Sequence, residues 1–82
     1  MTQKPPHLTL IGVTDRSAGT LKLTFDYKHL PDKTHEEVDG LPPAELEATV
    51  QQLKREGWQI ESQCANPSGS LFTEIYTFTR PD

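Results

Sequence analysis

The chain has 82 residues, a formal net charge of -4 and a single cysteine, and 33% of its residues are hydrophobic. This length accommodates one small domain, residues 1–82, and no second core. The acidic balance disfavours binding to nucleic acid or to an anionic membrane, because both depend on many cationic contacts. One cysteine excludes a disulfide within the chain and a metal cage made of thiolates.

The first six residues are polar and contain two prolines, so we expect residues 1–6 to form a disordered tail. They lack the apolar core of a signal peptide. No apolar run reaches the ~20 residues that a membrane span requires. We therefore expect a cytoplasmic protein with no membrane association.

Two strands are predicted in the first third of the chain. Residues 7–13 are rich in β-branched and apolar side chains, which favour a strand. Residues 21–28 alternate with a period of two, and their apolar face consists of Leu21, Leu23, Phe25 and Tyr27. This period is typical of a half-buried strand. Turn-forming residues between the two segments predict a hairpin.

The next segment, residues 29–41, is predicted as a long loop. It contains Pro31, Gly40, two histidines and several acids, with few apolar side chains. Loops of this length are uncommon in compact domains and are often functional or mobile.

An amphipathic helix is predicted over about residues 42–56. Pro42 and Pro43 suit its first turn, where a missing N–H costs little. One helix face is apolar at the spacing i, i+4, i+7, formed by Leu46, Val50 and Leu53. Gly57 is predicted as the left-handed residue of a Schellman cap, which would bring Trp58 against the last helical turn.

Two further strands are predicted after the helix. The first starts directly after the cap, with an inward face made of Trp58, Ile60, Ser62 and Cys64. Residues 66–69 read Asn-Pro-Ser-Gly, which indicates a turn. The last strand, residues 71–80, is apolar on both faces, as in a central strand or one that awaits a partner. The sequence therefore predicts an α+β fold, a four-stranded antiparallel sheet in the order ββαββ with one helix packed on one face.

Residues 46–81 resemble a group of small bacterial domains of unknown function. The shared features are a helix that runs into Glu-Gly-Trp, here Glu56 to Trp58, and a hairpin that ends in Thr-Arg-Pro at residues 79–81. The resemblance implies a fold and a bacterial or phage origin, and it implies no activity. Gln59 departs from the pattern, since an acid usually follows the tryptophan in those domains.

Three groups of residues have side chains that could form a chemical site. His29 and His35, with the acids between them, have the ligand chemistry of a divalent metal, but their spacing fits no metal motif and favours a solvated loop. Cys64 lacks a partner that would activate its thiol, which favours a small buried side chain. A thin basic strip on the first hairpin, made of Arg16, Lys22, Lys28 and His29, favours an ordinary solvated sheet face. No cofactor is expected.

The remaining hypothesis is a non-catalytic protein-binding module that recognises a protein partner or forms a homodimer. It would use the open sheet face, an edge strand and the segment 29–41, because one helix covers only one side of a sheet. The aromatic side chains are expected to pack mainly under the helix, with some of them exposed as interface anchors. The candidate partner-binding residues are Tyr27, His29, His35, Phe72, Tyr76 and Phe78. The alternatives are a nucleic-acid accessory protein that uses the basic hairpin and a small metal-dependent enzyme.

Overall fold

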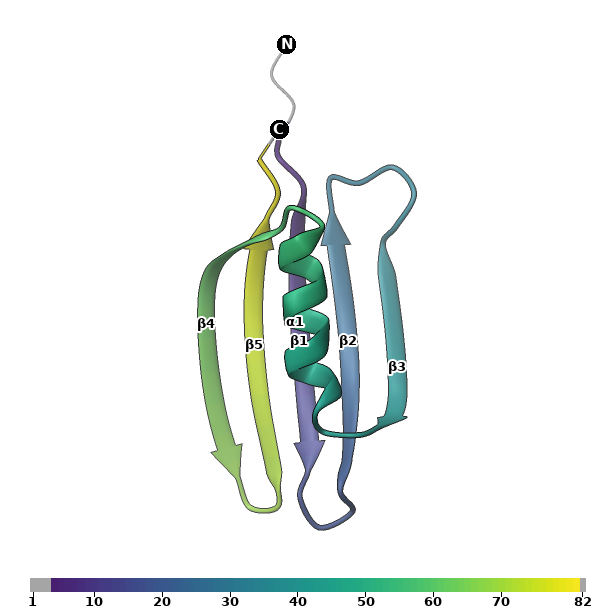
Figure 1. Ribbon diagram of the computed structural model, residues 1–82, viewed down its shortest axis with the longest axis vertical. Helices are drawn as coiled ribbons and strands as arrows, with labels where there is room; N and C mark the ends of the chain where they lie inside the picture. The colour runs from purple at the N-terminus through teal and green to yellow at the C-terminus, as the bar shows by residue number, and fades with distance from the viewer. Residues whose placement is uncertain (1–3, 82) are drawn as a thin grey trace.

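The computed structural model describes residues 4–81 as one helix on an antiparallel sheet of five strands (Figure 1). The elements in chain order are β1 (His7–Asp15), β2 (Thr20–Lys28), β3 (His35–Leu41), α1 (Glu45–Arg55), β4 (Gln59–Ser68) and β5 (Leu71–Thr79). Their order in the sheet is β3-β2-β1-β5-β4, so β1 is central and β3 and β4 form the two edges. The α+β class and the single helix agree with the sequence prediction.

The prediction of four strands in the order ββαββ is wrong, because the described chain reads βββαββ. Residues 29–41 are not one long loop: only 29–34 connect two strands, and His35–Leu41 forms the edge strand β3. The pairing with β2 begins where the N–H of Tyr27 donates to the carbonyl of Thr34 at 2.9 Å. Most of β3 is exposed, so main-chain hydrogen bonds to β2 hold it, and its side chains show no apolar alternation.

The helix α1 is shorter than predicted, and its C-terminal cap is confirmed. Pro42 and Pro43 lie in the turn before the helix, where the Pro42 carbonyl accepts from the N–H of Glu45 at 3.0 Å. At the other end, the N–H of Trp58 donates to Leu53 at 3.0 Å and the N–H of Gly57 donates to Lys54 at 3.1 Å. These are the two hydrogen bonds of a Schellman motif, and the φ of 97° at Gly57 is the left-handed conformation that the motif requires.

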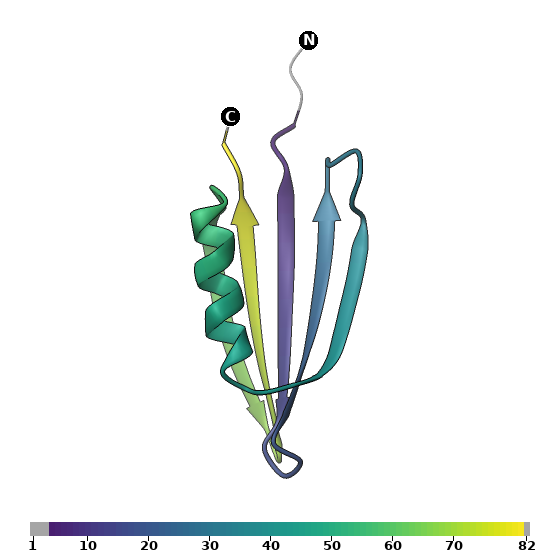
Figure 2. The ribbon, with the colours of Figure 1, turned by 45° about the vertical axis from the view of Figure 1, so that its right-hand side comes forward.

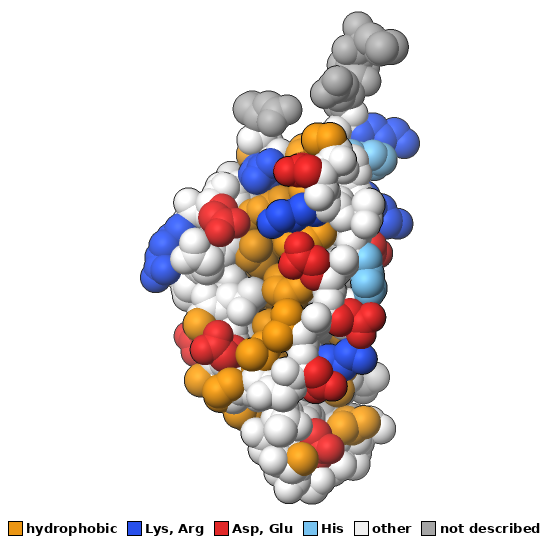
Figure 3. Space-filling model, turned by 90° about the vertical axis from the view of Figure 1, so that its right-hand side faces the viewer, with side chains coloured by type: hydrophobic (Ala, Val, Ile, Leu, Met, Phe, Trp, Pro, Cys, Tyr) orange, Lys and Arg blue, Asp and Glu red, His pale blue; other side chains and the backbone are white. Residues whose placement is uncertain are grey.

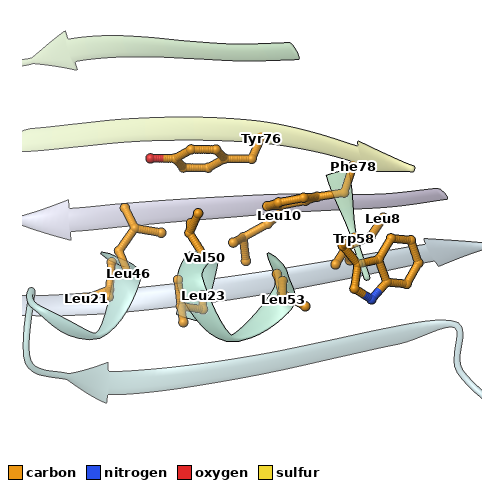
Figure 4. Close-up of a cluster of buried hydrophobic side chains, with 10 residues drawn as sticks. All are labelled: Leu8, Leu10, Leu21, Leu23, Leu46, Val50, Leu53, Trp58, Tyr76 and Phe78. Carbon is orange, nitrogen blue, oxygen red and sulfur yellow. The ribbon is translucent and has the colours of Figure 1, made fainter. Parts of the chain in front are cut away.

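The hydrophobic core lies between α1 and the sheet (Figure 4). The helix contributes the predicted stripe Leu46, Val50 and Leu53, and Trp58 closes the core at the end of α1. The sheet contributes Leu8, Leu10, Leu21, Leu23, Tyr76 and Phe78. Gly12 on β1 allows this packing, because a Cβ there would lie 3.0 Å from both methyl carbons of Leu46.

The inward face predicted for β4 is wrong beyond Ile60. A β-bulge at Glu61 shifts the register, so that Ile60 opposes Phe78 while Ser62 opposes Thr77. Since one extra residue reverses the alternation, Ser62 and Cys64 point to the side of the sheet away from the helix. Cys64 is therefore exposed and not a small core residue.

The hairpin turns follow the predicted turn chemistry, with one shift. In the β1–β2 turn, the side chain of Asp15 accepts from the main-chain N–H groups of Ser17 and Ala18 and from the Ser17 hydroxyl. These three hydrogen bonds lower the pKa of Asp15. In the last hairpin, the strand continues to Ser68, so the turn is shorter than the predicted 66–69.

At the ends of the described chain, the carbonyl of Pro6 accepts from the N–H of Arg80 at 3.2 Å. The predicted tail 1–6 thus reaches a defined contact at Pro6, and residues 1–3 lie outside the described range. Within residues 4–81, no helix has both the length and the apolar character that a membrane crossing needs.

Candidate protein-binding surfaces

The sheet has one covered and one open side (Figures 1 and 2). The helix α1 lies on one side, and within residues 4–81 no helix or loop is drawn across the other. The strand register assigns each side chain to a side, since directly opposed residues of antiparallel strands share a face. Leu8, Leu10 and Gly12 of β1 face the helix, so Thr9, Ile11 and Val13 face the open side.

The open side is uncharged over three neighbouring strands. Its members, which we call the neutral face, are Thr9, Ile11 and Val13 of β1, Thr73, Ile75 and Thr77 of β5, and Ser62, Cys64 and Asn66 of β4. Ile11 and Ile75 oppose each other at its centre. The nine register positions of these rows carry no Lys, Arg, Asp or Glu; the rows end near His7 and Asp15 on β1 and next to the bulged Glu61 on β4.

The open side is charged over β2 and β3. The Nζ of Lys22 lies 3.0 Å from Oε1 of Glu37, and Nε2 of His35 lies 3.0 Å from the other carboxylate oxygen. The hydrogen bond from His35, followed by the hydrogen bond from Lys22, lowers the pKa of Glu37. The same face is therefore divided into a neutral part and a part with paired charges.

On the covered side, α1, β2 and Lys33 line a groove on the flank of the helix that faces the β3 edge, which we call the α1–β3 groove (Figure 3). Its volume is about 330 Å³. The rings of Phe25 and Tyr27 lie parallel along its floor, with centroids 6.2 Å apart, and the Nζ of Lys33 lies 5.4 Å from the centre of the Tyr27 ring. Glu45 and Glu56 border the groove from the helix. Figure 3 shows this hydrophobic strip between acidic side chains.

A second groove, of about 440 Å³, lies between α1 and β4. The hydroxyl of Tyr76 donates to Oε2 of Glu74 at 2.8 Å and accepts from Nε2 of Gln63 at 3.4 Å. Burial, together with the carboxylate of Glu74, raises the pKa of Tyr76 to about 12. This hydroxyl therefore stays protonated at neutral pH and fixes Glu74 and Gln63 at the groove floor.

The structure separates the predicted aromatic residues into core and surface. Phe78 is completely buried and Tyr76 is 8% exposed, so both belong to the core, as expected for aromatics packed under the helix. We therefore leave these two out of any docking surface. Tyr27 is half-buried in the α1–β3 groove, and burial raises the pKa of its hydroxyl. Phe72 is also half-buried, with the Arg16 guanidinium 6.0 Å from its ring centre.

The two predicted histidines do not come together. The ring of His29 packs edge to face against the ring of His7, with centroids 6.1 Å apart. The backbone φ of His29 is 63°. His35 lies on β3 and contacts Glu37. Across residues 4–81, no three side chains of His, Cys, Asp or Glu are placed to hold one metal ion.

The basic strip on the first hairpin is thinner than its sequence suggests. Lys22 is paired with Glu37, and the guanidinium of Arg16 donates to the carbonyl of Gly69 at 2.8 Å. Lys28 and His29 are exposed at the far end of β2. Two of the four predicted cationic groups therefore already have protein partners.

The neutral face was not predicted from the sequence, although the apolar residues at alternating positions of β1 indicate it. Ile11 and Val13 fall on the side opposite to Leu8 and Leu10, so β1 is apolar on both faces. Attention to aromatic residues pointed instead to Tyr76 and Phe78, which face the helix.

Comparison with protein-family models, curated proteins and solved structures found no significant match to this chain. The resemblance of residues 46–81 to small bacterial domains therefore stays a prediction.

Proposed function

We propose that this chain is a non-catalytic protein-binding module that docks a protein through the neutral face. The observation that carries the proposal is the uncharged row of side chains on β1, β5 and β4, with Ile11 opposite Ile75. The docking surface is the open sheet face expected from the sequence, and its centre is formed by β-branched residues and not by aromatic ones.

A sheet face that stays in water is usually formed by polar and charged residues. The outer face of β2 is an example, with Lys22, Asp26 and Lys28. Burying a fully exposed isoleucine side chain is worth roughly 1.5–3 kcal/mol, and the half-buried Ile11 and Ile75 have part of that gain left to contribute. Ile11, Val13 and Ile75 together therefore supply the driving force of an interface centre. The threonine methyl groups around them extend an apolar surface that costs little side-chain entropy to immobilise.

The surroundings of the neutral face supply the polar rim that interfaces usually have. The charged side chains of β2 and β3, including His35 and the Lys22–Glu37 pair, border it on one side. The β3 edge is accessible beyond this rim, whereas the α1–β3 groove, with Tyr27, lies on the opposite, covered side of the sheet. A partner therefore needs an uncharged apolar centre, which another protein or a second copy of this chain can supply.

The structure favours this function over nucleic-acid binding. Contacts to phosphates require free cationic groups, and the pairing of Lys22 and Arg16 leaves few of them on the first hairpin. We therefore advance no second function.

The test compares Ile75→Lys with Ala18→Lys, which adds the same charge in the exposed β1–β2 turn. Each immobilised variant and the parent chain would capture proteins from a lysate of the source cell, and light scattering would report self-association. We expect Ile75→Lys to lose the captured protein, or the self-association, by at least tenfold, while Ala18→Lys retains it. Circular dichroism would show that both variants are folded.

Equal capture and equal self-association by the two lysine variants would contradict the proposal. A strictly monomeric parent chain that retains no protein would do the same.

A further inference from the structure

We propose that two copies of this chain associate through β4, antiparallel to each other about a two-fold axis near Cys64. The inference goes beyond the proposed function, because it concerns the sheet edge and would hold even if the neutral face bound no other protein. It is carried by the difference between the two sheet edges, by the sequence of β4 and by the resulting register.

The two edges differ in charge. The edge strand β3 carries Glu36, Glu37 and Asp39, so two copies of it would bring acids together. Charged side chains on an edge strand are a common protection against pairing with another chain. The edge strand β4 has the single acid Glu61 and no basic residue. Like-charge repulsion therefore opposes self-pairing of β3 but not of β4.

The middle of β4 is free to pair, whereas its ends are not. The bulge at Glu61 disturbs the ladder at one end, and Pro67 lacks an N–H at the other. Between them, residues 62–66 read Ser-Gln-Cys-Ala-Asn, are all exposed and pair with β5 on one side only. These residues thus present an uncharged stretch of edge backbone that a strand of the same length could extend.

The register that places Cys64 opposite Cys64 is self-complementary. It sets Ser62 of one copy against Asn66 of the other, where hydroxyl and amide groups can form hydrogen bonds. Glu61 then faces Pro67 of the second copy, and the two Glu61 residues lie ~20 Å apart along the strands, from the rise of ~3.3 Å per residue. No like charges meet in this arrangement. A head-to-tail pairing of β3 with β4 would instead leave an edge free and grow into an open chain.

The pairing also explains why the uncharged part of the open side extends to the edge of the sheet. Joined at β4, two sheets would form one sheet in which β1, β5 and β4 of both copies are adjacent. The two neutral faces would become one continuous surface across the two-fold axis. The charged strands β2 and β3 would lie at the two outer ends, away from the junction.

The strength of this association follows from its size. A pairing of five residues per strand buries much less than the ~1,200–2,000 Å² of a stable interface. The dimer should therefore be weak and depend on protein concentration. Directly opposed residues of antiparallel strands have Cα atoms ~4.5–5.5 Å apart, which is within the range of a disulfide. The thiol of Cys64 can thus report the register.

The first experiment measures the mass by sedimentation velocity over a range of concentrations. One variant carries Ser62→Glu with Asn66→Glu, and a second carries Ser62→Lys with Asn66→Lys, so each places like charges across the proposed pairs. We expect the parent chain to dimerise, both variants to be monomeric, and an equimolar mixture of the two to dimerise again. Both replaced positions, 62 and 66, are exposed, and thermal melting would show that the variants are folded.

The second experiment treats the parent chain with diamide. Two Cys64 thiols give up two protons and two electrons to diamide, which becomes the hydrazine, and an S–S bond joins the chains. The matched control, Cys64→Ser with Ala18→Cys, moves the thiol to the exposed β1–β2 turn. We expect at least tenfold faster cross-linking of the parent, and slower cross-linking of either charge variant alone.

A parent chain that is monomeric at every soluble concentration would overturn the inference. A dimer that is indifferent to the charge variants, or cross-linking as slow as in the control, would do so too. Ile75→Lys separates this inference from the proposed function, because it leaves residues 62–66 unchanged whereas Ser62 and Asn66 belong to both surfaces. A dimer that persists in Ile75→Lys pairs through β4, and a dimer that this variant abolishes joins through the neutral face.

Discussion

At the scale of single residues, Gly12 determines how closely α1 approaches the sheet. It lies on the central strand β1, and a Cβ there would be 3.0 Å from both methyl carbons of Leu46. Its φ is not in the left-handed region, so the requirement is one of space and not of backbone conformation. The missing side chain of Gly12 therefore leaves the space that Leu46, the first buried side chain of α1, occupies.

We expect Gly12→Val to destabilise the fold by about 1–3 kcal/mol, the usual cost of overpacking a filled core. The measurement is urea unfolding followed by circular dichroism. Thr9→Val, on the same strand but on the open side, is the matched control and should change the free energy of unfolding by less than about 0.5 kcal/mol. Equal stability of Gly12→Val and Thr9→Val would show that α1 does not pack on Gly12.

Gly12 could not be assigned this role from the sequence, because a glycine within a strand indicates equally a bulge, a bend or a close approach. The core stripe of α1 was predictable, since the spacing of Leu46, Val50 and Leu53 has a single helical interpretation. A periodic pattern specifies which side is buried. It does not specify which partner residue makes room.

At the scale of elements, the cap at the end of α1 was predictable, and the edge strand β3 was not. Gly57 and Trp58 follow a helix with the composition of a Schellman motif, so local sequence alone specifies the turn. β3 is held by pairing with β2, which depends on residues distant in sequence. Its exposed acids show no alternation. The bulge at Glu61 was hidden for the same reason, since only the pairing with β5 reveals an extra residue.

We expect Gly57→Ala to destabilise the fold by about 1–2 kcal/mol, the cost of placing a residue with a Cβ in the left-handed conformation. Space is not the obstacle, because the nearest atom to the added Cβ would be 3.7 Å away, on the flexible Arg80 side chain. Thermal unfolding would measure the loss, with the exposed helix substitution Gln51→Ala as control. If both variants melt at the same temperature, the cap contributes nothing to stability.

At the scale of the whole molecule, a single helix on a sheet of five strands leaves one side bare. That consequence was predictable from the count of elements, but the composition of the bare side was not. The strands β1 and β5 are adjacent and both apolar on both faces, which places Ile11 opposite Ile75. Strand order in space is required for this conclusion, and it is a property of long-range pairing that no local pattern contains.

The same architecture predicts a gradient of stability across the sheet, which hydrogen exchange followed by NMR would measure. Amides of β1 should exchange most slowly, because β1 has a strand on each side and the helix above it. Amides of the two edge strands β3 and β4 should exchange fastest, since both edges are almost entirely exposed. In a monomer, the outward amides of β4 should exchange as fast as those of β3.

Association through β4 changes this expectation at one edge only. Raising the protein concentration should slow exchange of the outward amides within residues 62–66, because they become hydrogen-bonded to the second copy, and should leave β3 unchanged. The variant with Ser62→Glu and Asn66→Glu should show no such dependence on concentration. Protection that rises equally at both edges would indicate general aggregation, and protection that rises at β3 alone would place the interface at the acidic edge instead.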